Sequence, residues 1–532
     1  MEPVIDTDVL VVGAGPTGLT AAVLLADHGV RVLVVEKNQG TGDEPRAISV
    51  TDETLRVMQG IGVLGRLAPE MLMDTGARYF GRRGRLLAEV HPASSRLGQP
   101  AKSQFDQPVM EESLLGAARD RDRVRLCFEA EAVSARDLGD RVETTVRGPW
   151  GETAVHARWV IACDGGRSPI RHRSGIPMEG STQVEEWIVV DLLNTGEHEK
   201  FAEFHCNGVR PAVVVPGAGG RCRFEFMLLS GETAERMTTP DMVATLTEPY
   251  LHRRVAPGDI RRARVYVAHQ RVARDYRRGR VLLAGDAAHM MPPFAGQGLN
   301  AGIRDAANLA WKVAAAVQGT GTDALVGTYE TERRPHAVQM VEISRRIGLI
   351  VMSTDPKITV ARDLLLRGTG LVPPLKRWIT GMRFLKQPHF ARGCVAPAPG
   401  GLPRAVTDLV GRSLPQPTVR LPEGGTAPLD TVLGPEWNAL RFGAGPGAGV
   451  EIIRLGAEPG APDAPVVVTD ESGAFAGPGA EPVTLLVRPD RYVAAAAPAG
   501  REPETFAELA HLVPWLPEAW RRQDHDRPAL SS

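Results

Sequence analysis

The sequence predicts a mixed α/β protein in which a parallel sheet carries an inserted antiparallel sheet and a separate C-terminal region follows. Three observations predict this fold. An apolar strand at residues 8–12 runs into a glycine-rich turn and then into a helical pattern. Residues 176–267 instead form short alternating runs between Gly and Pro turns, which is typical of antiparallel strands. The Pro- and Gly-rich stretch at residues 394–403 marks a boundary before the remaining chain.

Length and composition narrow the class of protein. The chain has 532 residues, which corresponds to about three domains at roughly 150 residues each. Lys and Arg total 62 against 63 Asp and Glu, so the net charge is −1 and supplies no field for a polyanion. We therefore expect no nucleic-acid partner.

The cysteines and the N-terminal segment bear on redox chemistry and location. The five cysteines are scattered without a CxxC pair, which argues against a disulfide framework, a zinc site or a dithiol centre, and we expect no metal. The N-terminus carries acids where a signal peptide needs basic residues, and no apolar run approaches the roughly 18 residues that cross a bilayer. The sequence thus predicts a cytoplasmic protein without a membrane partner.

The first elements form a complete βαβ unit. A buried parallel strand is expected at residues 8–12, because the run is β-branched and aliphatic throughout. Residues 19–27 are rich in Ala and Leu, and Gly29 stands where a helix C-cap is expected. A second strand follows at residues 30–35 and ends at Glu36.

The turn inside this unit predicts a dinucleotide site. Gly13, Gly15 and Gly18 allow the backbone to approach a pyrophosphate while the next helix packs on the strand, and the helix N-terminus offers free N–H groups. Glu36 follows the second strand, where an acid accepts hydrogen bonds from ribose hydroxyls. The alternative is a glycine-rich turn without a ligand.

The middle of the chain continues the α/β pattern. Apolar spacing predicts amphipathic helices at residues 51–67 and 109–119, and alternation predicts strands at 142–162. Helical texture returns at residues 299–317 and continues towards residue 390, with breaks expected at Pro335 and at Pro373-Pro374.

A second motif bears on the choice between NAD and FAD. Residues 281–283 resemble a buried strand that leads into Gly285-Asp286, and an Asp after such a turn can accept from a ribityl hydroxyl. The bend at residues 296–298 opens a helix whose N-terminal amides could stabilise the negative charge of a reduced isoalloxazine ring.

Three motifs together resemble a known family. They are GAGPTGL at residues 13–19, CDGGRSPIR at 163–171 and GDAAHMMPPFAGQGLN at 285–300, and TYETERRP at 328–335 is typical of the closing helix. In this order and spacing they resemble the single-component FAD-dependent aromatic hydroxylases of the p-hydroxybenzoate and phenol hydroxylase superfamily. Within this superfamily the sequence pattern is most similar to the 3-(3-hydroxyphenyl)propionate hydroxylase-like members and the aromatic polyketide hydroxylases.

The resemblance implies a domain plan. It places a Rossmann-like FAD-binding domain in residues 1–175 and 269–393, and a substrate-binding β-sheet domain in residues 176–268. Residues 394–532 resemble the thioredoxin-like extension of the larger members, here without a CxxC, so a structural or dimer-related role is favoured. The chain is expected to be a monomer or a homodimer.

The resemblance also implies the residues that contact the cofactor. Arg46 resembles the arginine that contacts the cofactor and the mobile flavin, and Asp164-Gly165 resembles an element that serves both FAD and NAD(P)H. The full set is Gly13, Gly15, Pro16, Thr17, Gly18, Glu36, Lys37, Arg46, Gln107, Val133, Asp164, Gly165, Asp286, Pro293, Gly296, Gln297, Gly298, Leu299 and Asn300.

The implied activity is that of a monooxygenase with non-covalent FAD. NADPH or NADH reduces the flavin, O₂ adds to give a C4a-hydroperoxide, and this species hydroxylates an aromatic substrate, expected here to be a polycyclic phenol or quinone of a polyketide pathway in antibiotic biosynthesis. The alternatives are Baeyer–Villiger-type insertion beside a ketone and, from another class, a flavin-binding protein without turnover.

No protein nucleophile is required by this chemistry. Arg46, Pro293 and His289 are the candidates for a catalytic role, although for His289 a structural role behind the Pro292-Pro293 turn is favoured. Substrate contacts are expected in and around the inserted sheet, where Arg210 has an ion pair as its alternative role and half of the alternating side chains must form ordinary core. The candidates are Phe204, His205, Arg210, Phe224, Phe226 and Phe294.

Overall fold

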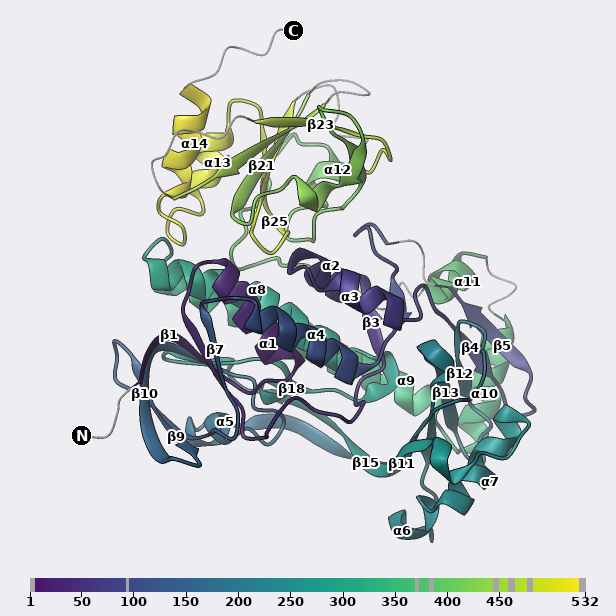
Figure 1. Ribbon diagram of the computed structural model, residues 1–532. Helices are drawn as coiled ribbons and strands as arrows, with labels where there is room; N and C mark the ends of the chain where they lie inside the picture. Colours follow the sequence, from purple (N-terminus) through teal and green to yellow (C-terminus); the bar gives the residue numbers. More distant parts are fainter. Residues whose placement is uncertain are drawn as a thin grey trace.

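A computed structural model describes residues 5–91, 95–368, 373–381, 387–443, 449–457, 465–475 and 482–525. It contains three large sheets and a two-stranded ribbon (Figure 1). The predicted mixed α/β class is confirmed. Within the described residues, no helix combines the length and the apolar character needed to cross a membrane.

The first sheet builds the nucleotide-binding domain. Its central strands pair in parallel in the order β17-β10-β1-β2-β7, because the apolar runs of these strands are buried on both faces. Antiparallel strands flank them. The strands are β1 (Ile5–Val12), β2 (Val32–Val35), β7 (Val124–Cys127), β8 (Glu131–Asp137), β9 (Val142–Gly148), β10 (Gly151–Ala162), β16 (Arg277–Arg278) and β17 (Val281–Leu283).

Helices cover this sheet and place its phosphate-binding turn. α1 (Pro16–Asp27) follows β1 and packs on the long helix α8 (Gly298–Gln318), with α4 (Gln107–Arg119) beside it (Figure 1). α5 (Pro169–Arg173) lies against β8. The helix expected at residues 51–67 is divided into α2 (Asp52–Gly60) and α3 (Leu64–Leu67), because the chain turns at Gly62 with a positive φ of 77°.

The second sheet faces the nucleotide-binding domain and is almost wholly antiparallel. Its order is β18-β15-β11-β14-β13-β12-β4-β5, and β12 with β4 is the parallel pair. The strands are β4 (Gly76–Phe80), β5 (Leu86–Val90), β11 (Met178–Leu192), β12 (Phe201–His205), β13 (Ala212–Pro216), β14 (Cys222–Met227), β15 (Ile260–Ala273) and β18 (His289–Met290). α6 (Ala234–Met237) and α7 (Pro240–Leu251) follow β14 in the chain.

The predicted boundaries of this sheet domain were incomplete. β4 and β5 come from residues 76–90, well before the predicted insertion at 176–268, and β18 comes after it. The chain therefore enters the sheet domain more than once. β3 (Ser49–Thr51) precedes the first of these passages, β6 (Lys102–Gln104) follows it, and the two strands pair as an antiparallel ribbon.

Long helices close the second domain. α9 (Asp323–Val351) continues through Pro335, contrary to the expected break, and buried residues run along it from Leu325 to Gly348. Tertiary packing of this kind outweighs the single backbone hydrogen bond that proline removes. α10 (Pro356–Gly368) and α11 (Pro373–Thr380) follow and contact β5.

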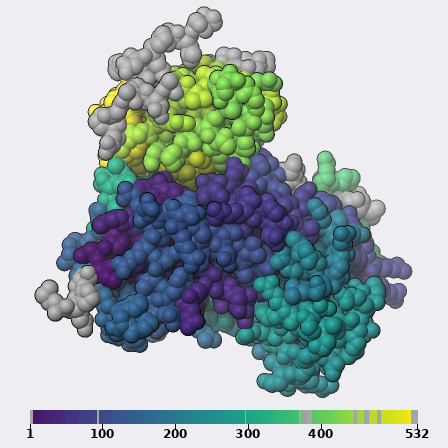
Figure 2. All heavy atoms as spheres, in the orientation of Figure 1, coloured from purple at the N-terminus to yellow at the C-terminus, as the bar shows by residue number. Residues whose placement is uncertain are grey.

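The C-terminal region forms a lobe on the helical layer of the first domain (Figures 1 and 2). Trp311 of α8 packs edge-on against Trp437, with ring centroids 5.6 Å apart, so the cores of the two domains meet. Strand pairing in the seven-stranded sheet is antiparallel. Its elements are α12 (Arg404–Thr407), β19 (Thr418–Arg420), β20 (Thr426–Pro428), β21 (Trp437–Phe442), β22 (Val450–Leu455), β23 (Val466–Asp470), β24 (Val483–Val487), β25 (Val493–Pro498), α13 (Glu502–Ala507) and α14 (Leu516–His525).

Candidate active site

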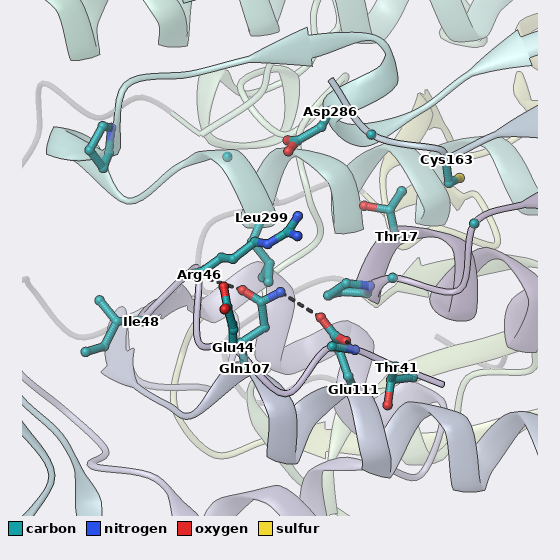
Figure 3. Close-up of a pocket in the computed structure, with 18 of the residues that line it drawn as sticks. Thr17, Thr41, Glu44, Arg46, Ile48, Gln107, Glu111, Cys163, Asp286 and Leu299 are labelled. Atoms are coloured by element: carbon teal, nitrogen blue, oxygen red, sulfur yellow. Dashed lines mark hydrogen bonds between the residues drawn. The ribbon is translucent and has the colours of Figure 1, made fainter. Parts of the chain in front are cut away.

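A cavity of about 850 Å³ joins the carboxyl ends of the parallel strands to the inner face of the second sheet (Figure 3). This is where open α/β sheets bind ligands. One end of the cavity is lined by the glycine-rich turn and Glu36, and the other by side chains of β4, β12, β13 and β14. Its size is within the range of small-molecule and cofactor sites.

The glycine-rich turn is shaped for close approach of a phosphate. Gly13 has φ of +105°, and a Cβ there would lie 2.5 Å from the carbonyl oxygen of Cys163. A Cβ on Gly18 would lie 2.0 Å from the Gly13 oxygen, so these two glycines are required by the protein's own packing. Gly15, by contrast, lines the cavity, and no atom lies within 4 Å of the position that a Cβ would take there. That open space at the start of α1, beside Pro16 and Thr17, fits a pyrophosphate.

Glu36 is held in place for ribose hydroxyls. Its Oε2 accepts a hydrogen bond from the backbone N–H of Ala14 at 2.9 Å, and its Oε1 accepts from that of Asn38 at 3.0 Å. Two backbone donors fix the carboxylate at the end of β2, and the adjacent Lys37 also lines the cavity. Val133 does not line it. The neighbouring residues Glu131 and Ala132 do, because a bulge in β8 interrupts the register there.

Gln107 positions the loop that carries Arg46. Its Oε1 accepts from the N–H of Ala47 at 2.6 Å, and its Nε2 donates to Glu111 Oε1 at 2.6 Å (Figure 3). The loop is also held from the second sheet, because Arg223 donates to the carbonyl oxygen of Arg46 at 2.6 Å. The Arg46 side chain extends into the cavity towards Leu299 and Asp286.

Asp164 offers an unsatisfied acceptor. Its Oδ2 accepts from the N–H of Ile170 at 3.2 Å, whereas Oδ1 is buried without a hydrogen-bond partner among the described residues. Burial raises the pKa of this carboxyl group. A buried oxygen of this kind beside the cavity, with Gly165 next to it, fits a polar ligand group.

The loop after β17 supplies the opposite wall. Asp286 lines the cavity and is exposed to it, since the strand ends one turn earlier. The lining residues of this loop that the sequence predicted are Asp286, Pro293, Phe294, Gly296, Gln297, Gly298 and Leu299.

Two predicted residues of this loop lie behind the wall. Asn300 is fully buried, where Oδ1 accepts from the hydroxyl of Thr54 at 2.6 Å and Nδ2 donates to the Gly296 carbonyl at 2.6 Å. His289 is also fully buried and pairs through Nε2 with Asp305 at 2.6 Å. Asp305 additionally accepts from the N–H of Gly285, so both side chains hold the loop rather than face the cavity.

The inner face of the second sheet presents one continuous row of side chains. Tyr79, Phe204, Val213 and Glu225 are register partners on β4, β12, β13 and β14, and all four line the cavity. The rings of Tyr79 and Phe204 stack with centroids 4.8 Å apart. The row therefore has aromatic side chains on β4 and β12, an aliphatic side chain on β13 and an acidic one on β14.

Other predicted substrate contacts lie elsewhere. Phe224 and Phe226 point into the core on the opposite face of β14. On that side His205 stacks on Phe80 and meets Tyr250 edge-on. Arg210 forms a bidentate ion pair with Glu232 instead. The prediction took the wrong face of β14 because both faces of this sheet are buried, so alternation alone does not identify the cavity side.

Sequence reasoning missed Glu225, the acidic end of the row. The hydroxyl of Tyr266 donates to Glu225 Oε2 at 3.2 Å. Burial raises the pKa of Glu225, while the nearby Arg223 lowers it. The alternation of Arg223 and Glu225 with two phenylalanines was the available signal, because buried charged residues are retained where they are paired or used.

The fold, the glycine-rich turn and the attached aromatic cavity define a nucleotide-binding protein with a site for a small ligand. Comparison with known proteins identifies the family. Residues 6–344 match the model of the FAD binding domain family, and residues 411–512 match that of the HcaD C-terminal domain. The chain belongs to this FAD-binding family.

Similar curated proteins are hydroxylases. The chain is 38% identical to the 3-(3-hydroxy-phenyl)propionate/3-hydroxycinnamic acid hydroxylase of Mycolicibacterium smegmatis, over 95% of this chain and 93% of that one. It is 34% identical to the 3-(3-hydroxy-phenyl)propionate/3-hydroxycinnamic acid hydroxylase 2 of Burkholderia vietnamiensis, over 95% of this chain and 98% of that one. Among solved structures, the anhydrotetracycline hydroxylase of Streptomyces rimosus matches with a TM-score of 0.72 and 25% identity, over 96% of this chain and 99% of that one.

The chain is therefore an FAD-dependent monooxygenase that acts as an aromatic hydroxylase, with NAD(P)H as the co-substrate typical of the family. The alternative of a flavin-binding protein without turnover is set aside. Gly13, Gly15, Gly18, Glu36 and Asp286 stand where they would hold the FAD, and the cavity geometry fits this cofactor.

Arg46→Ala is expected to slow flavin reduction while FAD stays bound. The side chain lines the cavity, and no hydrogen bond or ion pair to it is found among the described residues, so its removal breaks no polar contact within the domain. Stopped-flow measurement of flavin reduction by NADH and NADPH, with FAD content as the control, checks this. Unchanged reduction kinetics would show that Arg46 has no role in flavin reduction.

Proposed function

We propose that this monooxygenase hydroxylates a phenolic ring whose hydroxyl group is held by Glu225. The observation that carries the proposal is the row across the second sheet, which ends in one buried acceptor after aromatic and aliphatic side chains. Bound FAD supplies the redox chemistry, namely reduction by NAD(P)H and activation of O₂.

The surroundings of Glu225 suit a proton acceptor. Among the described residues, the Tyr266 hydroxyl is the donor to its side chain, and Glu225 lines the cavity with 9% of its surface exposed. Its pKa is raised by burial, towards the pH at which enzymes work, and the pKa of Tyr266 is raised well above its ordinary value. A phenol bound here donates to Glu225, which makes the ring more electron-rich.

The nearby Arg223 favours the charged form of this acceptor, against the burial that raises its pKa. Arg223 donates to Asp191 at 2.7 Å and to the Arg46 carbonyl oxygen. These hydrogen bonds hold its positive charge in a fixed position near Glu225. The apolar neighbours in the row exclude water from the ring.

Glu225→Gln is expected to lower the turnover number for hydroxylation by about 10²-fold or more, because a general base is lost. In the unchanged enzyme kcat rises with pH as Glu225 loses its proton, and the variant loses this dependence. Product mass and NAD(P)H consumption measured across pH check both effects.

Glu203→Gln is the matched control, since Glu203 lies on β12 of the same sheet, is paired with His205 and does not line the cavity. An unchanged pH profile in Glu225→Gln contradicts the role of Glu225.

Two classes of substrate, monocyclic and polycyclic, are candidates. The 38% identity to hydroxylases named for single-ring phenols supports a monocyclic substrate. The predicted polycyclic polyketide is supported by the likeness to the anhydrotetracycline hydroxylase and, at 27% identity and a TM-score of 0.72, to BexE, described as acting in oxidation during BE-7585A biosynthesis. Substrate-stimulated NAD(P)H oxidation by both classes of compound distinguishes them, and labelled O₂ found in a lactone would indicate oxygen insertion instead.

A further inference from the structure

The short helix α2 lies between the C-terminal domain and the start of α8 (Figure 1). On one side, Arg56 donates to both carboxylate oxygens of Asp430 at 2.7 Å and to the carbonyl oxygen of Leu414 at 2.6 Å. On the other side, the Thr54 hydroxyl donates to Asn300, which follows the loop that lines the cavity. One helix therefore contacts both the C-terminal domain and the wall of the active site.

Glu53 of α2 accepts a hydrogen bond from each of these two sides. Its Oε2 accepts from Arg304 Nε of α8 at 2.5 Å, and its Oε1 accepts from the hydroxyl of Tyr492 at 3.2 Å. Tyr492 belongs to the C-terminal domain, directly before β25, and its ring stacks on Phe390 with centroids 4.5 Å apart. The Glu53 carboxylate thus connects a fixed tyrosine of the C-terminal domain to α8.

Arg304 extends this connection to the cavity. Its Nη1 donates to Oε1 of Gln297 at 3.0 Å, and Gln297 lines the cavity directly before α8 begins. Arginine offers donors only, so the amide oxygen is the atom that faces it, and the amide N–H groups lie on the other side of the planar group. Tyr492, Glu53, Arg304 and Gln297 therefore form a polar bridge from the C-terminal domain to the cavity wall.

The polar bridge is buried and includes an ion pair. Glu53 and Tyr492 are 7% and 9% exposed, so water competes little for their hydrogen bonds. Burial, and then the Glu53 carboxylate, raise the pKa of Tyr492 well above its ordinary value, so its hydroxyl keeps the proton that it donates. A buried ion pair costs desolvation free energy and is a weak source of stability, whereas charge-assisted hydrogen bonds fix direction as well as distance. The arrangement suits positioning.

Other contacts attach the C-terminal domain to the FAD-binding domain. Trp311 packs on Trp437 across the boundary, and Arg488 pairs with Glu332. None of these four residues lines the cavity, whereas the polar bridge ends at one that does. Attachment of the domain therefore does not account for the course of the bridge.

We propose that the C-terminal domain uses the polar bridge to hold Gln297 in place against the flavin ring of bound FAD. The adjacent N-terminus of α8 favours negative charge, which a reduced flavin carries. The other three members of the bridge are positioning residues, since they act on FAD only through Gln297. This inference goes beyond the proposed function, because it concerns the cofactor and not the phenol held at Glu225.

Tyr492→Phe removes one hydroxyl of the bridge and keeps the ring. With Gln297 less firmly held, we expect reduced flavin to lose about 2- to 30-fold in affinity relative to oxidised flavin, the range for coupling through contiguous networks. At about 30 mV per tenfold change for two electrons, the midpoint potential of the bound flavin falls by about 10 to 45 mV. The potential is measured on the FAD-loaded protein without substrate, and titration of FAD into apoprotein gives the affinity of the oxidised form.

Ser413→Ala is the matched control. The Ser413 hydroxyl accepts from Arg56 Nη1 at 3.0 Å, so this change also removes one hydroxyl where α2 meets the C-terminal domain. Ser413 is not part of the polar bridge, so the flavin potential should be unchanged. Melting temperatures of the apoproteins report any general loosening of the fold. Glu53→Gln, which removes the charge that pairs with Arg304, is the second test variant and should lower the potential as Tyr492→Phe does.

Gln297→Met shows whether the effect of Tyr492 passes through Gln297. If it does, adding Tyr492→Phe to Gln297→Met leaves the potential where Gln297→Met alone places it. Additive shifts, an unchanged potential in both Tyr492→Phe and Glu53→Gln, or an equal shift in Ser413→Ala each overturn the proposal. Loss of phenol hydroxylation by Glu225 variants with an unaltered flavin potential bears on the proposed function alone, so the two proposals fail separately.

Discussion

Gly15→Asp is expected to yield a folded protein that no longer retains FAD. The structure leaves open space around the Cβ position of Gly15, so the new side chain displaces no protein atom. The carboxylate instead enters the part of the cavity that fits the pyrophosphate. Two unit charges 4 Å apart repel by about 4 kcal/mol at an effective dielectric of about 20, which corresponds to a roughly 10³-fold weaker affinity.

Flavin absorbance of the purified variant, together with a titration of FAD into apoprotein, measures this effect. Gly15→Asn is the matched control, because asparagine has the same shape without the charge, and it should weaken FAD binding much less. Substitution at Gly13 or Gly18 gives no such separation, since a Cβ there collides with the protein backbone. A yellow, fully loaded Gly15→Asp protein would contradict the placement of the pyrophosphate.

The parts of this site that are local in sequence are the parts that sequence reasoning found. The βαβ unit, the glycine turn and Glu36 lie within one short stretch, and each residue type is required there by backbone geometry or by ligand chemistry. The loop from Asp286 to Leu299 was likewise found, because its motif follows a strand directly. For the same reason Asn300, one residue further on, was included although its side chain is turned inwards.

The substrate end depends on how separate strands assemble, which one sequence does not disclose. Glu225 meets Val213, Phe204 and Tyr79 only because four strands from two parts of the chain come into register. Both faces of β14 are buried, so a shift of one residue exchanges the phenylalanine face for the acidic face.

The C-terminal domain is held to the FAD-binding domain by a buried charge cluster, centred on Arg488. The guanidinium group is fully buried and contacts both carboxylate oxygens of Glu332 on α9 at 2.9 Å. Glu332 also accepts from Lys312 of α8 at 2.7 Å, and Arg488 lies against the rings of Trp311 and Phe390. The cluster thus connects α8, α9 and the turn after β24.

Charge balance in this cluster is reflected in the pKa of Glu332. Burial alone raises this pKa, but Arg488 and then Lys312 outweigh it and hold the pKa at about 2. Because the folded value lies below the ordinary 4.5, the stability contributed by Glu332 is present above pH 4.5 and is lost as the pH falls towards 2.

Arg488→Met is accordingly expected to destabilise the chain by about 3–5 kcal/mol, because it leaves a buried carboxylate with part of its counter-charge removed. The C-terminal domain should become sensitive to limited proteolysis near residues 394–403, and acid unfolding should begin at a higher pH as the pKa of Glu332 rises.

Arg501→Met, at an exposed pair with Glu504, is the control and should change stability by less than about 1 kcal/mol. Adding Glu332→Gln to Arg488→Met should cost less than the two single changes summed, since each partner's charge is costly mainly when the other is missing. Full additivity would show instead that Arg488 and Glu332 do not stabilise each other across the domain boundary.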